Sequence, residues 1–125
     1  MKYFWPVINS LTALYGAAVV GLAAALMHVW NGLDSNDFGR LLSAISMLAF
    51  HTLALLIVGR QLPASKLLKL VVLLWHLGLW LFCWTLFAGV LTLPLYYSAL
   101  APLGGQILII GWLLLGISAW RKDVK

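Results

Sequence analysis

Four long apolar runs, almost free of charged residues, constrain the fold of this 125-residue chain more than any other feature. They cover about Pro6–Trp30, Leu41–Val58, Leu67–Leu91 and Pro102–Trp120. A membrane-spanning helix needs about 20 predominantly apolar residues, and each run is close to that length or longer. The runs therefore predict an all-α membrane protein with four transmembrane helices in a single integral membrane domain over residues 1–125.

Composition agrees with a chain whose solvent is partly lipid. Apolar residues make up 64% of the sequence and charged residues 9%, and the mean hydropathy is +1.04. A soluble domain has about half apolar and about a quarter charged residues. The net charge of +5 does not indicate nucleic-acid binding, because the basic residues stand in short clusters beside the apolar runs. The bilayer, with its anionic cytoplasmic surface, is the expected partner.

Lysine and arginine positions predict the orientation in the membrane, because loops on the cytoplasmic side carry more of them. One side of the predicted bundle would hold seven basic residues: Lys2, Arg60, Lys66, Lys69, Arg121, Lys122 and Lys125. On the other side only Arg40 is basic, and its loop also contains Asp34 and Asp37. We therefore expect both termini and the middle loop to be cytoplasmic. Tyr96 and Tyr97, in the uncharged loop before the fourth run, suit the opposite interface.

Small residues recur at helical spacing in the first and fourth runs. Ala13, Ala17, Gly21 and Ala25 follow one another at intervals of four, which places them on one stripe of a helix. In the fourth run Gly104, Gly111 and Ser118 recur at sevens, and Gly116 adds another small residue. Small residues let helix backbones approach closely in a membrane, where no hydrophobic force drives helices together. These stripes predict either a compact antiparallel four-helix bundle or a contact between subunits.

Several stretches resemble a known family. They are AALMH at 24–28, AFHTLALL at 49–56, LFCWTLFAGVL at 81–91 and APLGGQILIIGWLLL at 101–115. In this order they resemble the YgdD-like family of small bacterial inner-membrane proteins, domain-of-unknown-function family 423. The most specific pieces are the pair Phe50–His51 and the turn Pro102–Gly104–Gly105. The resemblance covers about Ala17 to Trp112. It implies a four-helix protein of the bacterial inner membrane, with no established activity.

Two positions depart from the family pattern. The first helix of the family usually ends in Gly-Ala-His, of which this chain keeps only His28. Where the third helix tends to show Ser-Gly-Ser, this chain has the bulkier Cys83-Trp84-Thr85. A role that requires a small polar notch in the third helix is therefore not expected.

Two histidines lie near the middle of the predicted membrane. His51 is nine residues before Arg60 and His76 is ten after Lys66, so both lie about 14–15 Å from the cytoplasmic edge. As a pair on facing helices they could ligate a haem, hold a metal or relay protons. The alternative is that each neutral imidazole bonds a hydroxyl or carbonyl of a neighbouring helix. We favour the structural alternative, with Ser43, Ser46, Thr52, Thr85 and Ser118 as candidate partners.

The remaining candidates have simple structural explanations. Arg40 could form an outer gate with Asp34 and Asp37, but an ion pair at the start of a helix is the simpler expectation. Cys83 is the single cysteine and, in apolar surroundings, is expected to behave as a small hydrophobe. Gly104 and Gly105 lack the following Lys-Ser/Thr of a phosphate loop, so close packing explains them better. The interior tryptophans are expected to be packing and interface anchors.

The sequence contains few residues that could form a catalytic site. An active site needs titratable groups that converge in a cavity, and the interior has three imidazoles, one thiol and no carboxylate. We therefore expect no enzyme activity, no cofactor and no metal, and a non-catalytic accessory or assembly subunit of a membrane complex or homo-oligomer. Two alternatives stay open. One is a small oligomeric channel or transporter using His51 and Arg40, and the other is a haem-binding electron-transfer subunit using His51 and His76.

Overall fold

The chain folds into four long helices. The structure is a computed structural model that describes residues 2–61 and 65–122, with the side chains of 121 and 122 excepted. The helices are α1 (Phe4–His28), α2 (Ser35–Gly59), α3 (Lys66–Leu91) and α4 (Leu100–Lys122). All four are long and apolar enough to cross a membrane. Lys125, which we counted among the cytoplasmic basic residues, falls outside the described residues.

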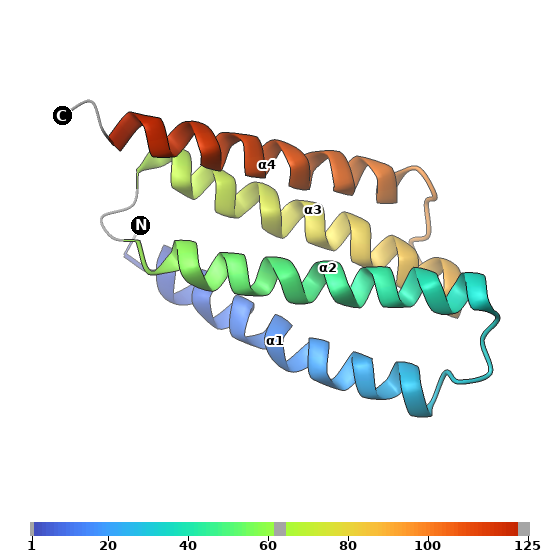
Figure 1. Ribbon diagram of the computed structural model, residues 1–125. Coiled ribbons are helices and arrows are strands. Elements are labelled where there is room, and N and C mark those ends of the chain that lie inside the picture. Colours follow the sequence, from blue (N-terminus) through green and yellow to red (C-terminus); the bar gives the residue numbers. More distant parts are fainter. Residues whose placement is uncertain (1, 62–64, 123–125) are drawn as a thin grey trace.

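Successive helices run antiparallel (Figure 1). The start of α1, the link between α2 and α3 and the end of α4 lie at one end of the molecule, and the other two connections lie at the opposite end. Lys2, Arg60, Lys66 and Lys69 are therefore at the end that holds both termini. Asp34, Asp37 and Arg40 are at the other end.

Each helix packs against the next one in the chain. Within the described residues α1 packs on α2, α2 on α3 and α3 on α4, whereas α1 and α4 do not pack on each other. Half of the apolar window of α2 and of α3 is buried, against 17% for α1 and α4. The core therefore lies along α2 and α3, and the predicted antiparallel packing of four helices is confirmed.

Side chains cap the two central helices at their first residues. The carboxylate of Asp34 accepts hydrogen bonds from the backbone N–H groups of Asn36 and Asp37, both at 2.9 Å. Ser65 caps α3 in the same way, with its hydroxyl accepting from the N–H of Leu68 at 3.2 Å. Such caps satisfy N–H groups that have no partner inside the helix. Because of the Asp34 cap, α2 begins six residues before the apolar run at Leu41.

The loop between α3 and α4 folds back along α3. The helix ends at Thr92, whose φ of 54° is left-handed, and Leu95 adopts a second left-handed conformation with φ of 61°. The indole N–H of Trp84 donates to the carbonyl of Pro94 at 3.2 Å. Trp84 is two turns before the end of α3, so this bond ties the loop back against the side of the helix. The uncharged loop thus returns toward the level of the apolar helices.

The predicted small-residue stripe on α4 packs against α3. Gly104, Gly111 and Ser118 are all buried. A Cβ atom added at Gly104 would lie 2.6 Å from the backbone nitrogen of Phe82 and 2.8 Å from the carbonyl oxygen of Gly78. At Gly111 it would lie 2.5 Å from the indole nitrogen of Trp75. No side chain fits at either place, which explains why both positions hold glycine. Gly116, in contrast, is exposed and has open space around it.

Candidate functional site

His51 makes two hydrogen bonds that determine its tautomer. The indole N–H of Trp112 on α4 donates to Nε2 of His51 at 3.1 Å. Because an indole nitrogen can only donate, Nε2 carries no proton and the proton of the neutral ring is on Nδ1. Nδ1 then donates to the carbonyl of Met47, one turn earlier in α2, at 2.9 Å. Both ring nitrogens are thus used inside the protein.

Aromatic rings surround this imidazole. The rings of Trp75 on α3 and Trp112 on α4 lie 5.8 and 6.0 Å from it between centroids, and 4.6 Å from each other. Phe50 lies 5.3 Å from Trp112 on the outer side, where it is 56% exposed. Aromatic pairs at such distances add about 0.5–1.5 kcal/mol each beyond burial. We call Phe50, His51, Trp75 and Trp112 the aromatic cluster; it connects α2, α3 and α4.

His76 is held by a different helix. Its Nδ1 lies 2.8 Å from the hydroxyl oxygen of Tyr15 on α1, and the two rings are 5.3 Å apart. The other ring nitrogen, Nε2, is buried without a hydrogen-bond partner among the described residues. Each buried histidine therefore connects helices that are not consecutive in the chain: His51 joins α2 to α4, and His76 joins α3 to α1.

The structure does not bring the two imidazoles together as a ligand pair. His51 is directed to α4 and His76 to α1, and axial ligation of one haem needs a free nitrogen from each ring. His51 has none. Among the described residues no three His, Cys, Asp or Glu side chains lie close enough to hold a metal ion. His76 bonds a hydroxyl of another helix, as expected. The partner of His51 on another helix is an indole, its carbonyl partner lies in its own helix, and none of the five predicted Ser and Thr partners is used.

The polar groups at the opposite end are engaged at the start of α2. Arg40 pairs with Asp37 at 3.4 Å, and both side chains are partly exposed. Asp34 caps the helix, as described above. His28 is exposed at the last residue of α1. This arrangement is that of a helix start at a membrane surface.

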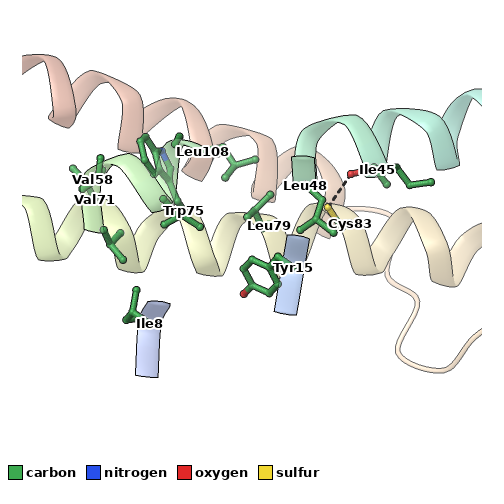
Figure 2. Close-up of a cluster of buried hydrophobic side chains, with 14 of the residues drawn as sticks. Ile8, Tyr15, Ile45, Leu48, Val58, Val71, Trp75, Leu79, Cys83 and Leu108 are labelled. Carbon is green, nitrogen blue, oxygen red and sulfur yellow. Dashed lines mark hydrogen bonds between the residues drawn. The ribbon is translucent and has the colours of Figure 1, made fainter. Parts of the chain in front are cut away.

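Cys83 is buried between α2 and α3. Its thiol donates to the carbonyl of Ala44 at 3.4 Å, a contact drawn as a dashed line in Figure 2. Thiols in apolar surroundings are weakly reactive. The geometry is that of a packing residue.

Three of the four small residues in the α1 stripe face away from the rest of the chain, whereas Ala25 is partly buried. Ala13, Ala17 and Gly21 are all exposed, and no atom lies within 4 Å of a Cβ built on Gly21. The helix instead packs on its neighbours through Ile8, Thr12, Tyr15 and Leu26. Gly105 is only partly buried, and a Cβ there would make an ordinary contact with Phe82 at 3.9 Å. The stripes on α1 and α4 thus have different roles, although both consist of small residues on one helix face.

Two important partners were not identified from the sequence. Tyr15, the partner of His76, is the only tyrosine inside the first apolar run, and a phenol at membrane depth needs a hydrogen bond. That signal was available. Trp112 was expected to pack, but its bond to His51 depends on how α4 is rotated against α2, and no local pattern encodes that rotation.

Comparison with known proteins assigns a family. The model of a family described as protein of unknown function (DUF423) matches residues 22–105, a range that includes Phe50–His51 and the Pro102–Gly105 turn. The chain belongs to the DUF423 family. It is also 27% identical to a UPF0382 membrane protein of Haemophilus influenzae over 115 residues, which are 90% of this chain and 93% of that protein. No solved structure matches.

DUF423 membership and the four apolar helices agree with each other. The protein is a multi-pass membrane protein with four candidate spans, and the bilayer is its surroundings. The resemblance noted from the sequence is thereby confirmed. The family description assigns no activity, so any function must be argued from the arrangement of the side chains.

Proposed function

We propose that this DUF423 protein is a non-catalytic membrane subunit that works by packing against other membrane-spanning helices. The observation that carries the proposal is the outward direction of Ala13, Ala17 and Gly21 on α1. Lipid tails are as apolar as leucine, so helices associate in membranes only where their backbones approach closely or hydrogen-bond. Most of the stripe of small residues on α1 is not covered by the rest of the chain. This supports association with a further helix, either of another copy or of another protein.

The polar interior supports the same proposal. The bonds of His51 and His76 connect pairs of helices within the chain, and Arg40 is paired with Asp37 at the surface. No observation favours the channel that would use His51 and Arg40, or the haem site that would use His51 and His76. Contacts within the described residues do not explain the small residues on the outer face of α1.

Molecular mass in mild detergent tests the proposal. We expect the purified protein to exceed the 13.8 kDa of one chain, as an oligomer or with a stoichiometric partner. The double variant Ala17→Leu/Gly21→Leu should return it to a monomer, because the larger side chains hold a neighbouring backbone away. The matched control is Gly116→Leu/Ala119→Leu, at exposed positions of α4, which should leave the mass unchanged. A monomeric wild-type protein, or an α1 variant that associates as before, would contradict the proposal.

A further inference from the structure

An apolar groove runs between α1 and α3. Its volume is about 480 Å³, and residues of both helices line it together with Leu48 of α2. The α1 wall runs from Leu11 through Ala18 to Leu22, and the groove continues to Trp30 beyond the helix end. The α3 wall runs from Leu79 to Leu91. The groove exists because α1 packs on α2 but not on the backbone of α3. Figure 2 shows part of its wall, with Tyr15 beside Leu79 and Cys83.

Among the described residues, the inner wall of the groove is almost entirely apolar. The hydroxyl of Tyr15 is engaged with His76, the thiol of Cys83 with the carbonyl of Ala44, and the indole of Trp84 with the carbonyl of Pro94. Water or a polar ligand would lose its own hydrogen bonds on entry and gain none. The occupant of the inner groove must therefore be hydrocarbon.

The dimensions of the groove favour a hydrocarbon chain as its occupant over a helix. From Leu11 to the end of α1 at His28 the helix rises about 26 Å, and the groove continues to Trp30, so a volume of 480 Å³ corresponds to a mean cross-section of at most about 18 Å². A helix with its side chains is about 10–12 Å across, which is a cross-section of about 80–110 Å². The body of a transmembrane helix from a second copy is therefore too wide to enter the groove. A single extended hydrocarbon chain, which is one methylene wide, fits the groove.

The position of the groove in the membrane indicates where the hydrocarbon chain comes from. The groove lies along membrane-spanning helices and extends to Trp30 and Leu93, at the end of the molecule that carries neither terminus. Tryptophan is enriched where the hydrocarbon core meets the headgroups. We propose that the groove is a specific site for one acyl chain of a glycerophospholipid, whose headgroup lies near Trp30 and whose chain runs along α1 toward Tyr15. This site is separate from the outer face of α1.

Native mass spectrometry of the full chain from mild detergent tests the site. We expect one phospholipid retained per chain after bulk lipid is removed. Ala18→Phe, which fills the groove from the α1 wall, should reduce the retained fraction at least fivefold. Ala119→Phe, on the exposed face of α4, should leave it unchanged. No retained lipid, an added mass other than a phospholipid, or equal retention in both variants would overturn the proposal.

A second measurement does not depend on the folding of a variant. The wild-type chain is reconstituted in phosphatidylcholine vesicles containing a small fraction of phosphatidylcholine with a photoreactive group at the end of one acyl chain. We expect crosslinks concentrated at Leu14, Tyr15 and Leu79, several-fold above those at Leu113 and Ile117 on the lipid-facing side of α4. Uniform labelling of all exposed residues would overturn the proposal. The oligomer mass is measured separately, so either proposal can fail alone.

Discussion

An imidazole in the middle of a membrane must find partners for two ring nitrogens among protein atoms, because lipid tails supply none. His51 does so completely, with an indole donor on one side and a backbone carbonyl on the other. His76 does so at one nitrogen only, since its buried Nε2 has no partner among the described residues. At this scale the histidines act as connections between helices. That role predicts that their partners matter for stability.

Replacing Trp112 by Phe should destabilise the fold by about 1–2 kcal/mol. The change keeps an aromatic ring but removes the N–H that Nε2 of His51 accepts from, and a buried acceptor without a partner costs about 1–3 kcal/mol. Denaturant-induced unfolding in detergent micelles measures the loss. Trp120→Phe is the matched control, because Trp120 is 82% exposed. Equal stability of the two variants would show that the bond to His51 contributes nothing.

At the scale of the helix, two stripes of small residues face different surroundings. The stripe on α4 is in contact with the backbone of α3, where Gly78 and Gly104 approach each other closely. The stripe on α1 is exposed. In the first case the small residues hold the chain together, and in the second they leave a face open for another helix. The same substitution should therefore have opposite effects at two glycines of α4.

Gly104→Ala should destabilise the protein, whereas Gly116→Ala should leave its stability unchanged or raise it. An alanine in a helix is favoured over glycine by about 1 kcal/mol. At Gly104 this gain is exceeded, because the new Cβ would lie 2.6 Å from a backbone nitrogen and α4 must move away from α3. At Gly116 nothing lies within 4 Å. The midpoint of thermal unfolding in detergent should fall for Gly104→Ala and should not fall for Gly116→Ala. A Gly104→Ala midpoint at or above wild type would refute the packing argument.

At the scale of the whole molecule, the even number of antiparallel helices places both termini at one end, together with the basic residues that precede α3. The opposite end carries the Arg40–Asp37 pair and the α3–α4 loop that folds back along its helix. This charge asymmetry predicts which end is cytoplasmic, since basic residues are retained on that side. The groove and the outer face of α1 then open laterally toward lipid.

Cysteine labelling of cells expressing the protein measures this orientation. In a Cys83→Ser background, which removes the single cysteine, one chain carries Lys2→Cys and another carries Gly32→Cys. A membrane-impermeant maleimide applied to intact spheroplasts should react with the Gly32→Cys chain. It should react with the Lys2→Cys chain only after permeabilisation. The reverse pattern would invert the orientation, and reaction of both chains from outside would contradict the antiparallel arrangement.

The sequence by itself determined the number of helices, their positions and the family. Length and hydropathy act locally, so a run such as Leu67–Leu91 specifies a helix wherever its neighbours lie, and the structure has it at Lys66–Leu91. Only the tertiary structure decided which face of each helix is buried. The stripes of α1 and α4 both consist of small residues at helical spacing, yet the α4 stripe packs and most of the α1 stripe is exposed, because burial depends on a neighbour supplied by another part of the chain. The partners of His51 and His76 were decided in the same way, since each lies on a helix that is distant in sequence and is brought near only by packing.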